Sequence, residues 1–193
     1  ITEVIFKVVY ESAPSLAQAV TACSDGGFDV LAGRSGSGSL ANIAASRVQM
    51  LCDDITVLAA SYDQVILDLG AGVDRTVRQL SHGAATCIVL ATDEPTSLTD
   101  AYAFIKMINA ERPGQDIRIV VNVANSTKEG ERTYHTLFKA CQGFLKMTPP
   151  LLGIIRRDAK VREAIRSQTL LLTRYPNSEA ALDVETIARR LGG

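Results

Sequence analysis

The stretch that decides the fold is Val65-Ile66-Leu67-Asp68-Leu69-Gly70-Ala71-Gly72. A short apolar run that is followed at once by a carboxylate and glycines predicts a buried strand ending in a loop. Such strands are typical of parallel sheets covered by helices on both faces. Because ligands in open α/β sheets bind beyond the carboxyl ends of the strands, Asp68 and the glycines behind it are the first candidates for a site.

Similar apolar runs recur along the chain and alternate with segments of helical spacing. Strands are expected at residues 28–32, 65–69, 87–91, 117–123 and 151–155. Helices are expected at about 40–60 and 74–80, from 95 and from 126 onward, and near 158–166 and 178–191. This alternation predicts an α/β fold of three layers, α/β/α, with a mainly parallel sheet. A length of 193 residues fits a single domain over residues 1–193.

Two of the helix starts carry capping signals. Ser97 and Asp100 have the spacing of a capping box, and Ser126 precedes a second capped helix. The polar residues at the expected strand ends are the ones to examine for binding. They lie at 33–38, 68–72, 93–96, 122–125 and 156–158.

The composition excludes several classes of protein. Twenty Lys and Arg residues against 21 Asp and Glu give a net charge of −1, so no nucleic-acid partner is expected. Cys23, Cys52, Cys87 and Cys141 are too far apart for a metal knuckle or a redox pair, which predicts reduced thiols in the core. No apolar run reaches the ~20 residues that span a bilayer, and no signal-peptide pattern opens the chain. The composition is that of a cytosolic protein.

Three other patterns have two interpretations each. Asp68 could orient Mg²⁺ through water, or it could cap the next helix or close a turn. Residues 36–41 read Gly-Ser-Gly-Ser-Leu-Ala, which is either a weak dinucleotide fingerprint or a flexible loop. Basic residues follow the last expected strand and either hold an anionic partner or face solvent. They are Arg156, Arg157, Lys160, Arg162 and Arg166.

Several segments together resemble one family. Residues 62–72 resemble the Walker B region of MinD/ParA-type ATPases, and the Asp-x-Gly-Ala-Gly form resembles the flagellar-number regulator FlhG branch. Residues 92–102 are similar to that branch's T-x-E-P-T-S-x-T-D-A-Y segment, 121–124 to its V-N-x-A element and 152–158 to its L-G-x-I-P-x-D element. The implied fold is P-loop NTPase-like, with the first strand or strands missing.

The resemblance implies roles for particular residues. Asp68 would be the catalytic acid that organises the Mg²⁺ shell through water, and Gly70 and Gly72 would border the phosphates. Asn122 would contact adenine. Asp158 would belong to the loop beside the base, where Arg156 replaces the family's proline.

The family's G-K-G-G-x-G-K-[ST] phosphate loop and its D-x-D segment do not occur in these 193 residues. The resemblance implies an ATPase that uses ATP or ADP with Mg²⁺. Because that loop supplies most of the charge stabilisation in phosphoryl transfer, we expect no appreciable ATP hydrolysis by this chain, and nucleotide binding stays open. The chain starts at Ile1, which indicates processing or a fragment relative to the family. We expect the place of the missing strand to be filled by re-pairing or by exchange with a second copy.

The resemblance also implies a biological role. The expected function is a nucleotide-dependent dimerisation switch that controls flagellar or other cell-pole assembly, as in the cell division and partitioning ATPases. The expected partners are a second copy and flagellar or other assembly proteins. The expected location is cytoplasmic, with peripheral contact at the inner face of the membrane through an amphipathic helix at 183–191, which could equally dock on the core. The alternatives are a non-catalytic interaction module that kept the fold without nucleotide, and an NAD(P)-binding oxidoreductase using Gly36, Gly38 and Ala41.

Overall fold

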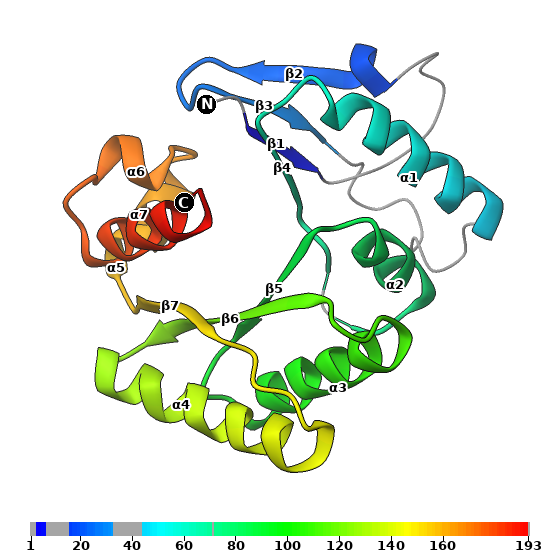
Figure 1. Cartoon of the computed structure of the whole chain (residues 1–193). Coiled ribbons are helices and arrows are strands. Elements are labelled where there is room, and N and C mark those ends of the chain that lie inside the picture. The colour runs from blue at the N-terminus through cyan, green and yellow to red at the C-terminus, as the bar shows by residue number, and fades with distance from the viewer. Residues whose placement is uncertain (1–2, 7–15, 33–43, 71, 193) are drawn as a thin grey trace. The chain divides into compact units, whose positions relative to one another are not determined.

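The computed structural model describes residues 3–6, 16–32, 44–70 and 72–192 (Figure 1). The chain forms two compact units, residues 1–84 and 85–193. That the two units make up one domain stays a prediction. Most of the glycine-rich segment, residues 33–43, lies outside the described residues, and with it the dinucleotide motif at 36–41.

The first unit contains a four-stranded sheet with the order β2-β3-β1-β4. Its strands are β1 (Glu3–Phe6), β2 (Val20–Cys23), β3 (Phe28–Leu31) and β4 (Gln64–Leu67). β1 pairs in parallel with both β3 and β4, and β2 runs antiparallel to β3. The two strands that the sequence predicts here, β3 and β4, lie on either side of β1.

β1 occupies the position between these two strands with residues of the same chain. Ile5 is paired with Val30 on one side and with Ile66 on the other. Since unpaired ladder groups inside a sheet are costly, a strand must fill such a position. In the described sheet β3 and β4 do not pair directly with each other, since residues 3–6 form the strand between them.

Helices cover the sheet of the first unit. They are the 3-10 turn η1 (Leu16–Ala19), α1 (Ala45–Ala59) and α2 (Arg75–His82). α1 agrees with the described part of the helix expected at 40–60. The core combines side chains from η1, β3, α1 and α2, namely Leu16, Leu31, Val48, Leu51, Ile55 and Leu80.

The second unit contains a three-stranded parallel sheet with the order β5-β6-β7. Its strands are β5 (Thr86–Ala91), β6 (Asp116–Ala124) and β7 (Leu151–Arg156). The helices are α3 (Pro95–Glu111), α4 (Thr127–Ala140), α5 (Ala159–Arg166), α6 (Leu171–Arg174) and α7 (Glu179–Leu191), with a π-helical turn, η3 (Cys141–Leu145), after α4. Apart from η3 and α6, which were not expected, the order of strands and helices agrees with the pattern read from the sequence.

Neighbouring residues of β7 show the three layers of this unit. A Cβ added at Gly130 of α4 would lie 2.5 Å from the side chain of Ile154, so α4 packs closely on one face. A Cβ added at Gly153 would overlap the side chain of Ile187 on α7, so α7 packs on the other face. Figure 1 shows α3 and α4 on one side of this sheet and α7 on the other. The predicted three-layer α/β/α fold is confirmed.

The helix ends test the capping predictions. Ser126 caps α4 as expected, since its hydroxyl accepts a hydrogen bond from the backbone N–H of Glu129 at 3.2 Å. The prediction for Ser97 is wrong, because α3 begins earlier and has Glu94 at its N-cap. The Ser97 hydroxyl instead accepts a hydrogen bond from the N–H of Thr92 at 3.0 Å. Over the described ranges, none of the helices is both long and apolar enough to cross a bilayer.

Candidate functional site

The carboxyl ends of β5, β6 and β7 form one edge of the second unit, because the three strands are parallel. The residues just beyond this edge come from three different loops. Ala124 is paired with Arg156, and the N–H of Arg157 donates to the carbonyl of Ala124 at 2.8 Å. We call residues 92–94, 122–125 and 156–158 the rim.

A β-bulge shapes the rim at Asn122. Val121 is paired with Ile154 and Ala124 with Arg156, so β6 has one more residue than β7 over this stretch. Val123 adopts φ +57°, a left-handed conformation that is uncommon for a β-branched residue and costs of order 1–3 kcal/mol. Bulges re-aim side chains and are common beside active sites. The strained residue therefore lies next to the Asn122 side chain that the sequence singles out.

The side-chain oxygen of Asn122 is hydrogen-bonded within the chain. Its Oδ1 accepts a hydrogen bond from the N–H of Val123 at 2.8 Å. The other end of an asparagine carboxamide, the NH₂ group, is a donor of two hydrogen bonds. With the oxygen held by its own backbone, Asn122 can offer the NH₂ group to an acceptor such as a ring nitrogen of a base.

Asp158 caps two helices at once. Its Oδ1 accepts from the N–H of Lys160 at 2.8 Å, at the start of α5, and its Oδ2 accepts from the N–H of Ala180 at 3.2 Å, at the start of α7. These backbone donors, the N–H of Lys160 first, lower the pKa of the Asp158 carboxyl below its usual value. Both oxygens are therefore used by the protein, and any contact to a base comes from the loop rather than from a free carboxylate.

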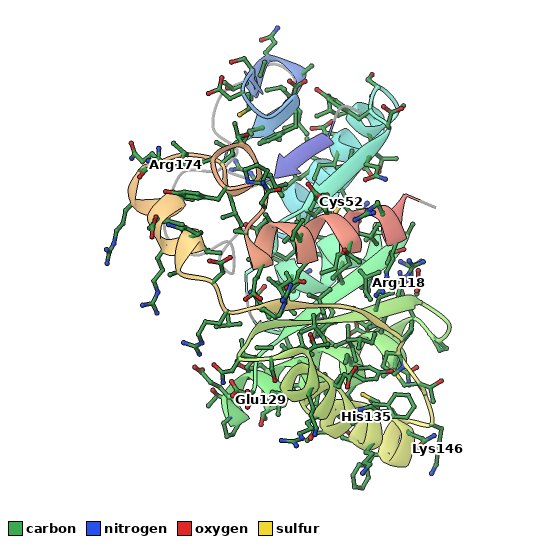
Figure 2. All side chains as sticks on the ribbon, turned by 90° about the vertical axis from the view of Figure 1, so that its left-hand side faces the viewer. Cys52, Arg118, Glu129, His135, Lys146 and Arg174 are labelled. Atoms are coloured by element: carbon green, nitrogen blue, oxygen red, sulfur yellow. The ribbon has the colours of Figure 1, made fainter. Side chains whose placement is uncertain are left out.

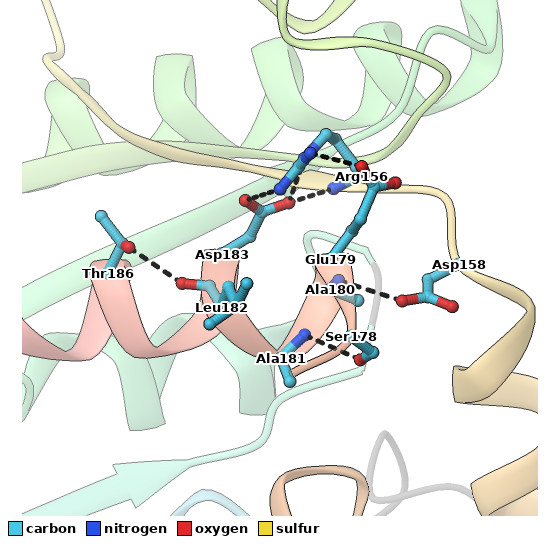
Figure 3. A network of polar contacts seen from close by, with 9 residues as sticks. All are labelled: Arg156, Asp158, Ser178, Glu179, Ala180, Ala181, Leu182, Asp183 and Thr186. Carbon is cyan, nitrogen blue, oxygen red and sulfur yellow. Dashed lines mark hydrogen bonds and ion pairs between the residues drawn. The ribbon is translucent and has the colours of Figure 1, made fainter. Parts of the chain in front are cut away.

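Arg156 is tied to α7. Its Nε and Nη2 donate to the two oxygens of Asp183 at 2.9 Å each, and its Nη1 donates to Glu179 at 2.7 Å. The backbone N–H of Arg156 also donates to Asp183, at 2.9 Å (Figure 3). The paired carboxylate of Asp183, more than any other group, raises the pKa of the Arg156 guanidinium. Arg156 is thus occupied within the protein and is not free for a phosphate.

The rest of the basic cluster is divided between paired and exposed residues. Lys160 forms an ion pair with Glu163 at 2.9 Å, and the hydroxyl of Tyr175 donates to the same carboxylate at 3.0 Å. Arg174, the last residue of α6, donates to the Tyr175 hydroxyl at 3.0 Å and is labelled in Figure 2. The remaining arginines, Arg157, Arg162 and Arg166, are exposed. A solvated surface therefore describes much of this cluster.

Asp68 follows β4 directly, in the first unit, and is exposed. The cap of the next helix is a different residue, since Asp74 accepts from the N–H groups of Thr76 and Val77 at 2.8 and 3.1 Å. Among the described residues, none donates a hydrogen bond to Asp68. The interpretation of Asp68 as a helix cap is therefore wrong, and a bond that closes a turn is equally lacking in the part of the chain described.

The glycines behind Asp68 leave open space. Gly72 adopts φ +124°, which side-chain-bearing residues rarely adopt, and an added Cβ at Gly70 or Gly72 would meet no atom of the described residues within 4 Å. Within the described ranges, no three His, Cys, Asp or Glu side chains gather as metal ligands. A single carboxylate beside open backbone fits Mg²⁺, which keeps several water molecules and takes phosphate oxygens as ligands.

Comparison with known proteins identifies the family. The model of the family described as cellulose biosynthesis protein BcsQ matches residues 31–191. The chain belongs to this family. The antiactivator FleN of Pseudomonas aeruginosa is 28% identical over 166 residues, which cover 86% of this chain and 59% of FleN. The flagellum site-determining protein YlxH of Helicobacter pylori is 28% identical over 164 residues, 84% of this chain and 55% of YlxH. The chain spans less than two thirds of the length of these relatives.

The fold of this BcsQ-family chain is that of MinD and ParA proteins. The septum site-determining protein MinD of Pyrococcus horikoshii, solved with Mg-ADP, superimposes with a TM-score of 0.71 at 17% identity, over 98% of this chain and 82% of that one. The resemblance to MinD/ParA-type proteins, with FleN and YlxH representing the FlhG branch, is confirmed.

The predicted site residues of the BcsQ-family chain fall into two groups. Asp68, Gly70 and Gly72 belong to the first unit, and Asn122 and Asp158 belong to the second. The structure brings Asn122 and Asp158 to the same rim through the pairing of β6 with β7. The roles in nucleotide binding that the resemblance implies for these five residues stay predictions.

Sequence reasoning missed two features of the rim. One is the bulge at Val123, which leaves no trace in an apolar run that reads as an ordinary strand. The other is the link from Arg156 to Asp183, which lies 27 residues away in the sequence. The signal that could have found the second is the arginine at the family's proline position, together with two carboxylates one helical turn apart at residues 179 and 183.

Proposed function

We propose that this chain is a MinD/ParA/FlhG-like regulator that binds ATP or ADP with Mg²⁺ and uses the nucleotide to control its association with a second copy. The observation that carries the proposal is Asp68. It stands at the end of β4 without a described hydrogen-bond donor, while Asp74 caps the next helix. A carboxylate kept free beside open glycine backbone fits the second-sphere ligand of a hydrated Mg²⁺.

The names of the relatives support a role as a nucleotide-binding regulator. FleN is an antiactivator, YlxH determines the flagellum site, and the structurally similar MinD was solved with Mg-ADP. The proposal extends this to control of flagellar or other cell-pole assembly from the cytoplasm, with peripheral contact at the membrane. Nucleotide-dependent association follows when a nucleotide binds one association state better than the other.

The proposed chemistry is divided between the residues of the chain and the metal. Asp68 would hold water molecules of the Mg²⁺ shell, Gly70 and Gly72 would let phosphates approach the backbone, and Asn122 would donate to the base. Bound Mg²⁺ neutralises charge on the phosphates. Because the 193 residues include no lysine-bearing phosphate loop, the proposal is one of binding and switching, with ATP turnover by this chain not appreciable.

Membrane contact through the last helix would require a rearrangement. The apolar stripe expected at 183–191 is docked on the sheet, because Ile187 of α7 is only 9% exposed and packs with Val120 and Leu152. The same helix buries Ala180 and Ala181. Of the two alternatives for this helix, docking on the core is the one that the structure has, and we assign membrane contact in this proposal to other residues.

Titration calorimetry with Mg-ADP and Mg-ATP tests the proposal. We expect Asp68→Asn to lower the affinity of the Mg²⁺-nucleotide about tenfold, because about 1.4 kcal/mol of charge-assisted contact is lost. Asp74→Asn is the matched control, since it removes the same charge but keeps a capping side chain, and it should change affinity less than about twofold. Light scattering of the same samples reports association.

The alternatives predict different titrations. A wild-type chain that gives no heat and no thermal shift with either nucleotide contradicts the proposal and supports a non-catalytic interaction module. Binding of NAD(P) in place of ATP or ADP supports an oxidoreductase. Equal effects of Asp68→Asn and Asp74→Asn would contradict the role given to Asp68.

A further inference from the structure

The last residue of β7, Arg156, and Asp158 in the loop that follows it both contact the first two turns of α7. On one side, Arg156 binds Asp183 with its backbone N–H, Nε and Nη2, and its Nη1 donates to Glu179. On the other side, Asp158 accepts from the N–H of Ala180. Figure 3 shows these contacts converging on the start of α7. We call the contacts of Arg156 and Asp158 with α7 the latch.

The contacts of the latch differ in strength. The Arg156 and Asp183 side chains are 28% and 17% exposed, whereas Glu179 is 63% exposed. A bidentate pair between a guanidinium and a carboxylate is stronger and more specific than an exposed single contact. Asp183 also accepts from the Arg156 N–H, so it fixes the backbone of the loop and not only a side chain. Asp183 therefore makes the strongest contact between α7 and Arg156.

A second side-chain contact joins α7 to β7, nearer the start of the strand. Arg190 Nη1 donates to the carbonyl of Leu152 at 2.6 Å. Asp183 and Arg190 are two helical turns apart, so they project from one side of α7. Both use side chains of α7 to satisfy backbone groups of β7, which also protects a strand at the edge of the sheet. The contact of Asp183 is with Arg156 of the rim, whereas that of Arg190 is with Leu152, near the start of β7.

The latch connects directly to the bulge. Asp183 holds the N–H of Arg156, and the next N–H along the chain, that of Arg157, donates to the carbonyl of Ala124. Ala124 follows the strained residue Val123 and lies two positions from Asn122. A displacement of the first turns of α7 would free the Arg156 backbone and thereby loosen the strand pairing that maintains the bulge.

We propose that Arg156 is a positioning residue that couples the docking of α7 to the shape of the rim, so that a partner or a variant that lifts the start of α7 weakens nucleotide binding. The part that concerns nucleotide rests on the proposed function. The part that links the docking of α7 to the shape of the rim rests on the hydrogen bonds alone. The sequence supplies the coupling by placing an arginine where the family has proline, a residue with neither a backbone N–H nor a charged side chain.

Hydrogen–deuterium exchange of the full 193-residue chain tests the coupling without nucleotide. Asp183→Asn should speed exchange at least about tenfold at residues 156–160 and also at 122–126, since loss of a charged, bidentate contact shifts local opening by a factor of this size. Arg190→Gln is the matched control. It loosens the other end of α7 and should speed exchange at 188–191 while leaving 122–126 unchanged.

A fluorescent ADP titration of the same variants completes the test. We expect Asp183→Asn to bind at least threefold more weakly than wild type and Arg190→Gln to bind within twofold. If Asp183→Asn does not fold by circular dichroism, Arg156→Lys replaces it, because lysine keeps the charge but cannot form the bidentate pair.

The outcomes separate the two proposals. Faster exchange in α7 with wild-type exchange at 122–126 overturns the coupling, whatever the nucleotide result. If wild type does not bind ADP but Asp183→Asn speeds exchange at 122–126, the proposed function fails and the coupling between α7 and the rim holds. If Asp183→Asn speeds exchange at 122–126 but ADP binds all variants equally, the claim that lifting the start of α7 weakens nucleotide binding is overturned.

Discussion

Gly153 of β7 is the position where a single methyl group tests the packing of α7 most sharply. A Cβ at this position would overlap the Cγ1 and Cδ1 atoms of Ile187. Ile187 is 9% exposed and belongs to the cluster with Val120 and Leu152, so it has little room to move away. Gly153→Ala must therefore push α7 outward or force Ile187 into a poor rotamer.

The size of the effect follows from packing. Overfilling a tight core costs about 1–3 kcal/mol, so Gly153→Ala should lower the free energy of unfolding by this amount. Ile187→Ala alone removes buried carbon atoms and should cost about 2–5 kcal/mol. In the double variant, the new methyl enters the space that Ile187 vacates. The combined cost should therefore be smaller than the sum of the two single costs by at least about 1 kcal/mol.

Urea unfolding followed by circular dichroism measures these free energies. Gly143→Ala is the matched control, because an added Cβ there meets no atom within 4 Å, and it should change the free energy of unfolding by less than about 0.5 kcal/mol. Additive effects of Gly153→Ala and Ile187→Ala would refute the reasoning, since they would mean that the two positions do not face each other across the interface between strand and helix.

The remaining predictions concern the rim. The pKa of Asp158 is lowered in the folded chain, so its stabilising effect is present above the ordinary carboxyl pKa and is lost as the pH falls through the lowered one. Asp158→Asn should thus cost about 1 kcal/mol at pH 7 and much less near pH 2, and urea titrations at the two pH values check this, with an equal cost at both contradicting it. Val123→Asn should raise the free energy of unfolding by about 0.5–1 kcal/mol, because asparagine tolerates the left-handed conformation at φ +57°; a decrease would show that the valine side chain contributes more than its backbone strain costs.

Local signals account for the parts of the structure that the sequence predicts well. Asp74, Ser126, Asp158 and Ser178 each stand before a helix and accept hydrogen bonds from its first N–H groups. A capping residue acts within three positions of itself, so its effect can be read from neighbouring residues. The capping prediction for Ser97 is wrong for a similarly local reason. Its hydroxyl accepts a hydrogen bond from the N–H of Thr92, five residues earlier, and not from an N–H of α3.

Features that depend on distant residues could not be predicted. β1 and β2 have four residues each, and their pairing depends on which strands lie beside them. The bulge at Val123 arises because β6 has one more residue than β7 between the pairs Val121–Ile154 and Ala124–Arg156, which neither strand reveals by itself. Likewise, the role of Arg156 depends on α7, whose position is set by the burial of Ile187 and not by the sequence around Arg156.

The candidate site was predictable only in part, because motifs fix residue types and not their partners. Asp68 was singled out by its place at a strand end and Asn122 by resemblance; among the described residues none donates a hydrogen bond to Asp68, and the NH₂ group of Asn122 can donate to a ligand. Asp158 was also singled out by resemblance, yet the structure gives its carboxylate two helix caps to satisfy. A carboxylate in a motif is a ligand only if the fold leaves its oxygens free.

The most direct test of the account is an NMR titration of the isotopically labelled chain with ADP and Mn²⁺ in place of Mg²⁺. A paramagnetic ion broadens the signals of nearby nuclei, and the account predicts broadening of the backbone signals of residues 67–74 together with smaller changes at 121–126, where the base would bind. Signals that change at neither segment, or only at residues distant from both, would contradict the roles proposed for Asp68 at the metal and for Asn122 at the base.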